Sequence, residues 1–449
     1  PSGWKFQSTD TATRYQSAAG GHTWYNSASG SADAALTWVK QLEIPASGNV
    51  IIANTGGTLQ TATAAGDASN LRLGSNAGNS IAAVGGTAAG SYNVLLGNEA
   101  GTSITTGYRN VFVGAFAGDA VDTGHNNVAI GLNALTLEDA GFNNIAIGSA
   151  ALNVQNGGQD NIAIGFNALT SNLTGDSNVA VGHSAGTFAT TAANSTFVGR
   201  FAGQGITGTK LTGNDNTAVG TNSGLLLQGA ATQNTFVGKG SGQAVTVGVK
   251  NTLLGSRSGD ALINADSNVA IGESALSSDT YGDGSVAIGD SALYAQNFTS
   301  AATSFNTAVG YASGNSTTTG QSNVFVGYAS GQFNSTGFAN TFVGSAAGTG
   351  VTGAKLTGSA NTAIGQGAGN DLQGGAGDNV FLGANAGGQV TTGSYNILIG
   401  HDAGTHDYPI TTGLNNIIIG AFSDVPSATG DDAIVMGYNV TGVGADNFT

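Results

Sequence analysis

Short apolar segments recur along the chain at an almost constant interval. Each is an apolar triplet preceded by Asn or Ser and followed by Gly, as in NVFVG at 110–114 and NVAIG at 127–131. The motif occurs about twenty times between residues 93 and 437, with glycines mostly 17 residues apart and a few steps of 18, 20 or 21. A fixed period of this length is typical of a solenoid, in which each repeat forms one coil.

Turn residues separate the triplets. The pattern TG-x-x-N precedes many of them, and x-x-[AS]-[GL] follows the triplet glycine. Each repeat therefore combines a short β-branched strand, a glycine turn, a segment of small residues and a second glycine turn. No 3.6-residue helical period competes with this pattern over the repeats. We predict an all-β chain of about twenty 17-residue coils.

Both faces of the predicted strand are apolar. In the triplet at 128–130, Val128 and Ile130 point to one side and Ala129 to the other. Six repeats carry Phe at the middle position, among them Phe112, Phe325 and Phe342. One apolar face of the strand can be buried inside the coil, whereas the other must be buried by residues from outside the coil. We expect sister chains to provide this cover, on the side of the middle residue.

The Asn residues that begin the triplets are also periodic. Stacked coils would bring them into a ladder of side-chain amides along the solenoid axis, with a structural role. Examples are Asn127, Asn144 and Asn161.

Composition narrows the possible partners. Of 449 residues, 75 are Gly and only 8% are charged, with a formal net charge of −15. Binding to nucleic acid needs clustered cations, and the eleven Lys and Arg are scattered, so we expect no nucleic-acid partner. No apolar run approaches the ~18 residues of a membrane span, so we expect a soluble chain without membrane insertion. The absence of Cys excludes a disulfide scaffold.

The repeat resembles two known families. Its unit, seen as NTAVGYASG at 306–314 and NVFVGYASG at 323–331, is similar to the head repeat of trimeric autotransporter adhesins and to arrays in bacteriophage tail fibres. The resemblance covers about residues 91–440. It implies a left-handed parallel β-roll, and three chains in each fibre.

The N-terminal part of the chain differs from the repeats. Residues 1–53 hold Trp4, Trp24 and Trp38, and the stretch at 35–52 is similar to aromatic β-segments that precede repeat arrays in phage tail fibres. We therefore divide the chain into an N-terminal aromatic β-segment for attachment (1–53), irregular capping repeats (54–90) and the β-roll fibre (91–449).

The resemblance also implies a function. It favours a virion tail fibre or spike that attaches a phage to its host, with a host-surface glycan or protein as receptor and other tail or baseplate proteins as partners. The alternatives are a bacterial surface adhesin and a purely structural extracellular filament. The sequence contains neither a coiled-coil stalk nor an anchor barrel, and on this ground we favour the phage fibre.

Catalytic and cofactor motifs are weak in this sequence. Two G-x-G-x-x-G matches, at 203–208 and 348–353, lack the helix that a dinucleotide site needs, and we interpret them as loops. The stretch HDAGTHD at 401–407 could hold a metal shared between loops or chains, but spacing alone is weak evidence and we interpret these residues as solvent-facing turns. A polysaccharide-degrading tailspike would need paired carboxylates in a groove, yet Glu occurs at only four positions. We predict no enzyme, cofactor or metal.

The turns vary while the triplets hold constant. Variable tips on a constant scaffold suit recognition, and exposed aromatic side chains suit sugar or protein contacts. Longer loops are expected at 203–215, 293–305, 348–360 and 404–415. The candidate receptor-contact residues are Tyr108, His125, Tyr294, Phe298, Phe338, His406 and Tyr408.

Overall fold

A computed structural model describes the strands within residues 12–61, residues 70–81 and residues 90–442. These residues contain strands, turns and bridges but no helix. The chain divides into two compact units, residues 1–191 and residues 192–449. Trp4 and Trp38 lie outside the described residues, as does most of the segment at 54–90.

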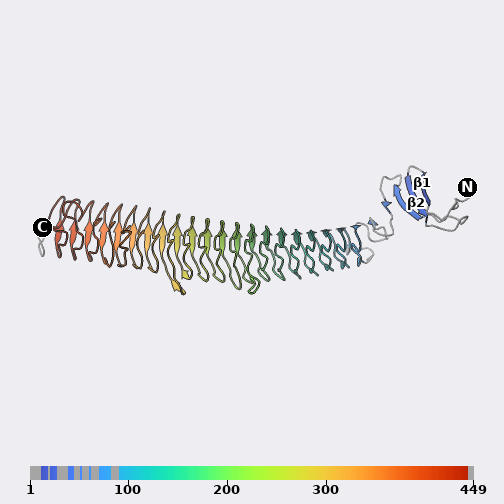
Figure 1. Cartoon of the computed structure of the whole chain (residues 1–449), viewed down its shortest axis with the longest axis horizontal. Coiled ribbons are helices and arrows are strands. Elements are labelled where there is room, and N and C mark those ends of the chain that lie inside the picture. The colour runs from blue at the N-terminus through green and yellow to red at the C-terminus, as the bar shows by residue number, and fades with distance from the viewer. Residues whose placement is uncertain are drawn as a thin grey trace, which may run out of the picture. The chain divides into compact units, whose positions relative to one another are not determined.

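The first unit begins with an antiparallel sheet (Figure 1). Its strands follow one another in the order of the sequence, and β2 pairs with both of its neighbours. The strands are β1 (Ala12–Ala18), β2 (Gly21–Ser27), β3 (Val39–Ile44) and β4 (Ile51–Ile52).

A parallel β-solenoid follows, as the period predicts. Each coil contributes one three-residue strand, and the strands of successive coils pair in register. In the first unit they are β6 (Leu71–Leu73), β7 (Val94–Leu96), β8 (Val111–Val113), β9 (Val128–Ile130), β10 (Ile145–Ile147), β11 (Ile162–Ile164) and β12 (Val179–Val181). The short β5 (Gln60–Thr61) pairs antiparallel with β6.

The second unit repeats the same coil. Its stacked strands are β13 (Thr196–Val198), β14 (Thr217–Val219), β15 (Thr235–Val237), β16 (Thr252–Leu254), β17 (Val269–Ile271), β19 (Val286–Ile288), β21 (Thr307–Val309), β22 (Val324–Val326), β23 (Thr341–Val343), β24 (Thr362–Ile364), β25 (Val380–Leu382), β26 (Ile397–Ile399), β27 (Ile417–Ile419) and β28 (Ile434–Met436). A two-strand insertion, β18 (Gly282–Asp283) with β20 (Ala302–Thr303), projects from this stack (Figure 1). About twenty coils in all confirm the solenoid prediction.

Glycine ends each strand because no other residue fits there. Gly114 has φ +136°, and a Cβ at this position would lie 2.5 Å from the carbonyl oxygen of Gly131 in the next coil. Coils at a spacing of ~4.8 Å can stack this closely only if the glycine positions carry no side chain. The triplet glycine is therefore a requirement of coil stacking.

The middle residue of each strand lies inside its own coil, so the expectation that sister chains cover it was wrong. Phe112, Phe325 and Phe342 are fully buried within the single chain. The first and third residues point outward instead, and Ile130 is 38% exposed. The alternation of the strand predicted two opposite faces but not which of them faces the small-residue segment.

The size of the strand centre limits the size of the residue opposite it inside the coil. Where the strand centre is Phe112, the residue four positions after the triplet glycine is Gly118, and a Cβ there would lie 2.5 Å from the Phe ring. Where the centre is Ala129, the same position holds the buried Leu135. Both Gly118 and Leu135 have left-handed backbones, with φ of 58° and 55°. Every Phe centre is paired with Gly at this position, whereas five of the nine Ala centres are paired with a buried Leu and the other four with Gly. A large centre therefore requires a small partner, and a small centre admits either.

The Asn side chains form a buried ladder. The backbone N–H of Asn144 donates to Oδ1 of Asn127, and Nδ2 of Asn144 donates to the carbonyl oxygen of Gly158, both at 2.9 Å. Asn161 continues the same pattern. Each amide thus satisfies backbone groups of the next coil that water cannot reach.

Candidate functional site

The first pair of predicted contact residues belongs to a stack of rings. The rings of Tyr108 and His125 are 4.7 Å apart and nearly parallel, and the ring of Phe142 lies 5.1 Å beyond His125. Both faces of His125 are therefore covered by neighbouring rings. Only the ring edges reach solvent, which leaves His125 without a face for a sugar to stack on.

The prediction for Phe298 was wrong. Its side chain is only 5% exposed, because the insertion folds back on the preceding coil. The carboxylate of the buried Asp279 accepts hydrogen bonds from the N–H groups of Phe298 at 3.0 Å and Gly282 at 3.2 Å. By contrast, Tyr294 from the same segment is 44% exposed.

The other predicted contact residues are exposed. Phe338 is 58% exposed and Tyr408 51% exposed. His406 is also exposed, and its ring packs edge-on against Phe422 at 5.2 Å.

The stretch HDAGTHD does not assemble a metal site. His401 lies 3.2 Å from Asp402, and His406 lies 3.3 Å from Asp407, so each His pairs with its own neighbour. Within the described ranges, no group of three or more His, Cys, Asp or Glu side chains has the arrangement of a metal centre.

The two G-x-G-x-x-G matches also have a structural explanation. Gly203 and Gly348 occupy the position opposite the strand centre, where they contact the rings of Phe197 and Phe342. No helix follows either match in the part of the chain that the structure describes. These glycines accommodate aromatic side chains of the core.

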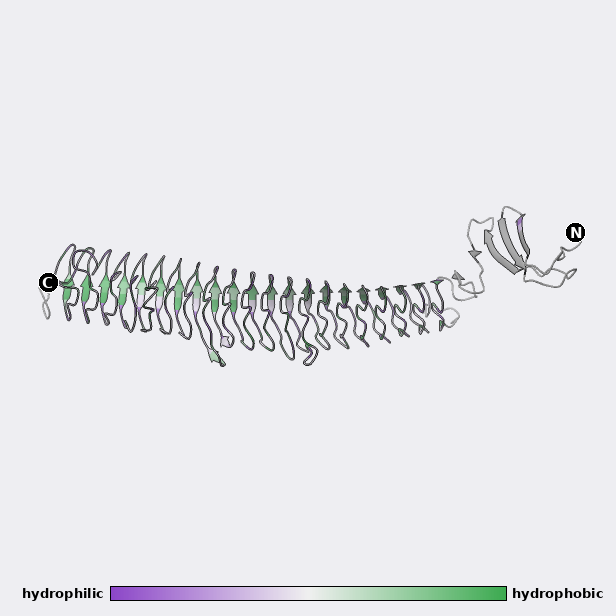
Figure 2. Cartoon of the chain, viewed as in Figure 1, coloured by the Kyte–Doolittle hydropathy of each residue, from purple (hydrophilic) through white to green (hydrophobic). Residues whose placement is uncertain are grey.

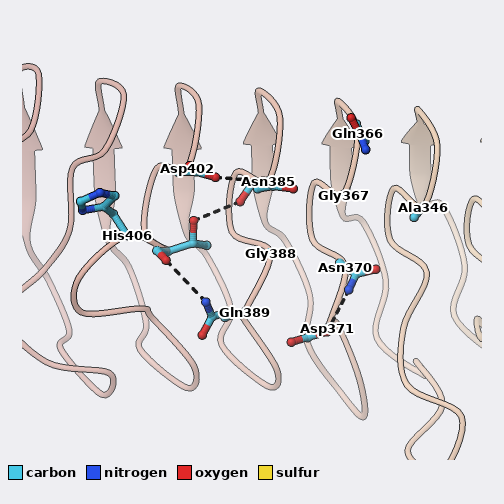
Figure 3. Close-up of a pocket in the computed structure, with 11 residues that line it drawn as sticks. Ala346, Gln366, Gly367, Asn370, Asp371, Asn385, Gly388, Gln389, Asp402 and His406 are labelled. Carbon is cyan, nitrogen blue, oxygen red and sulfur yellow. Dashed lines mark hydrogen bonds between the residues drawn. The ribbon is translucent and has the colours of Figure 1, made fainter.

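An open groove of about 530 Å³ lies on the connecting segments of four successive coils in the second unit (Figure 3). The residues follow β23, β24, β25 and β26. Its lining is polar apart from Ala346, Gly367 and Gly388. The polar lining residues are Gln366, Asn370, Asp371, Asn385, Gln389, Asp402, Thr405 and His406.

Hydrogen bonds within the groove fix two carboxylates. Nδ2 of Asn370 donates to Asp371 at 3.1 Å, and Nδ2 of Asn385 donates to Asp402 across one coil at 3.0 Å (Figure 3). Nε2 of Gln389 reaches the carbonyl oxygen of Thr405 at 3.5 Å. Among the residues that line the groove, the sequence predicts His406 as a contact residue and offers the stretch HDAGTHD, which contains Asp402, as a candidate metal site. The other lining residues carry no such signal in the sequence.

A second surface feature is the outer face of the stacked strands. Its first and third positions carry only Val, Ile, Leu, Met or Thr from β7 to β12 and from β13 to β28. Many remain exposed, including Leu382 at 45%. Figure 2 shows the strands in the colour of hydrophobic residues along both stacks. This strand face has no charged residue and has no cover within its own chain.

Comparison with known proteins gives no relative: no family model, curated protein or solved structure matches the chain. Within the described residues, there is no apolar helix of membrane-spanning length.

Proposed function

We propose that the protein is part of a homotrimeric bacteriophage tail fibre and attaches the virion to its host surface. The uncharged aliphatic strand face carries this proposal. Large exposed apolar patches on soluble proteins mark association sites. Sister chains packed by rotation around one axis would bury this face in a closed assembly. We take the number of chains, three, and the left-handed sense of the coil from the resemblance of the repeat to fibre families.

Two features support a role in attachment. The connecting segments expose large aromatic side chains, and trimerisation would present each of them three times. Multivalent presentation strengthens binding by contacts that are weak individually. The exposed aromatic residues include Tyr311, Tyr328, Phe338, Tyr395 and Tyr408.

Light scattering of the purified protein tests the assembly. The full chain should have three times the mass of the 43.9 kDa protomer. A double substitution, Ile364→Lys with Leu382→Lys, places two cations on the strand face and should shift the protein toward monomers. The matched control, Ser345→Lys, adds a cation at an exposed site off that face and should leave the trimer intact. A stable wild-type monomer would refute the trimer.

Antibody labelling tests the location and cell binding tests the role. Antibodies against the repeat should label phage tails in electron micrographs, whereas labelling of the bacterial envelope instead would support the adhesin. The fluorescent protein should bind the surface of susceptible cells and compete with infection. If the protein binds no cells, the attachment role fails and the purely structural filament remains as the alternative.

A further inference from the structure

Small residues leave room for the groove without being sufficient to create it. The second residue after the triplet glycine is Ala346 after β23 and Gly367 after β24, where a ring like that of Phe116 or Phe201 would fill the space, but it is also Ala in coils that do not line the groove, such as Ala150. Gly388 lines the same hollow. The cavity volume of about 530 Å³ lies within the ~300–1,000 Å³ that is typical of sites for small ligands.

The polar groups in the groove suit hydroxyl groups. An Asn amide binds one oxygen of Asp371 and one of Asp402, and Nδ1 of His401 lies 3.2 Å from the second oxygen of Asp402. Each carboxylate oxygen has two lone pairs, so both residues can accept a further hydrogen bond. Gln366, exposed at the rim, adds an amide that can both donate and accept. A sugar hydroxyl can donate to a carboxylate and accept from an amide, so it matches this mixture.

Charge excludes acidic ligands. Among the described residues that line the groove, none is Lys or Arg, and two are Asp. The whole chain carries a formal charge of −15. A phosphate, sulfate or uronic acid would meet like charges without a cation to pair with. The groove therefore does not suit an acidic ligand.

Periodicity favours a chain-like ligand. The groove has polar residues on three successive coils, after β24, β25 and β26. The coils are spaced ~4.8 Å apart, which is close to the length of one sugar residue in an extended glycan. Asn370 lies on the coil of β24, and Asn385 and Gln389 lie on the coil of β25. Asp402 lies one coil further on, where Asn385 donates to it. Successive sugars could thus meet successive coils.

We propose that this groove binds a neutral oligosaccharide, with Asp371 and Asp402 as hydroxyl acceptors and Gln366 and Asn385 as amide contacts. The inference rests on the proposed role in host attachment, because it names the class of surface ligand and the site that binds it.

Binding to an array of neutral, amino and acidic bacterial oligosaccharides tests the proposal. The full-length protein should bind members of the neutral set, and calorimetry with the best neutral oligosaccharide should then give its affinity. Asp371→Ala should weaken binding at least about tenfold, the effect expected for the loss of a hydrogen bond to a charged group. Ala346→Phe should abolish binding because the ring fills the groove, and other coils already carry Phe on this left-handed backbone.

A matched variant controls for the new ring. Ala150→Phe makes the same change at the equivalent position of a coil outside the groove, where φ is likewise 57°, and should bind like the wild type. Binding to acidic glycans only, absence of binding to every neutral oligosaccharide, or equal affinity of wild type and Ala346→Phe would each overturn the inference.

Cell attachment separates this inference from the proposed function. If the wild type and Ala346→Phe bind susceptible cells equally, attachment stands but the groove is not its site. If the wild type binds no cells, the attachment role fails, whatever the array shows.

Discussion

The backbone N–H of Asn144 donates a hydrogen bond to Oδ1 of Asn127, 2.9 Å away and one full coil earlier. Both residues are completely buried. The Asn side chains therefore do more than stack on one another: each accepts a hydrogen bond from a backbone N–H of the next coil and donates one to a backbone carbonyl oxygen there. The ladder therefore ties the position of every strand start to the coil before it.

Removal of one rung should destabilise its coil. Asn144→Ala leaves the N–H of Asn161 buried without its acceptor, whereas the carbonyl oxygen of Gly158 loses one of two donors and keeps Nε2 of Gln155. One buried unpaired group costs about 1–3 kcal/mol, so we expect a local loss of about that size. Hydrogen exchange of amides in coils β10 and β11 measures it, because stacked repeats open locally.

Serine provides the matched control for the ladder. Ser195 occupies a rung in the second unit, and its Oγ accepts the N–H of Asn216 at 3.2 Å. Asn144→Ser should therefore retain an acceptor and lose less protection than Asn144→Ala. Equal exchange rates in both variants would show that the side-chain acceptor contributes nothing.

The triplet glycine should tolerate no side chain. Gly114→Ala would place a methyl group 2.5 Å from the carbonyl oxygen of Gly131 and strain a backbone with φ +136°. The strain alone costs about 1–3 kcal/mol, and the clash adds to it. In contrast, Gly208→Ala has nothing within 4 Å of the new Cβ. Thermal unfolding should show a clear loss for Gly114→Ala and almost none for Gly208→Ala.

Much of the coil follows from the sequence, because its strongest constraints repeat. Gly114 and Asn127 recur at the same phase in nearly every unit, so the coil length and the turns could be predicted from them. The direction of Phe112 could not, since alternation along a strand assigns two faces without saying which one is enclosed. Its reciprocity with Gly118 is visible in the sequence and would have placed Phe112 inside.

The candidate site was less predictable. Phe298 resembles a loop aromatic, but its burial depends on a bond to Asp279 from the previous coil, 19 residues away. The groove depends on residues that are absent as much as on those that are present. Small residues at this phase, Ala346 and Gly367, also occur in coils that do not line the groove, as at Ala312 and Ala329, so they could not locate it from the sequence.

The pH dependence of stability should reveal a destabilising carboxylate. Burial raises the pKa of Asp283 above its ordinary value of 3.8, and the charges of Asp266 and Asp279 raise it further, although the hydrogen bond from the N–H of Asp266 opposes the change. The folded state then binds the proton more tightly than the unfolded chain. This contribution to stability is complete below pH 3.8 and is lost as the pH rises through the folded-state pKa.

Replacement of this carboxylate should therefore stabilise the protein at neutral pH only. Asp283→Asn keeps the Oδ1 acceptor for the N–H of Asp266 and removes the charge. We expect a higher Tm than the wild type at pH 7 and no gain at pH 3. Asp407→Asn, at a side chain that is 62% exposed, serves as the control and should change little. A gain that persists at pH 3 would assign the effect to something other than ionisation.

Exchange of the core residues between neighbouring coils tests the packing rule directly. Phe112→Ala should cost about 3–5 kcal/mol by leaving a cavity, and Gly118→Leu alone should clash with the Phe ring. The double variant rebuilds the arrangement of Ala129 and Leu135, whose Leu already has a left-handed backbone. We expect the double variant to recover at least half of the loss from Phe112→Ala. Hydrogen exchange in coils β8 and β9 would then give a favourable coupling energy of at least about 2 kcal/mol, because the loss from Gly118→Leu alone adds to it. If the two changes simply add, the reciprocity of large and small residues does not stabilise the coil.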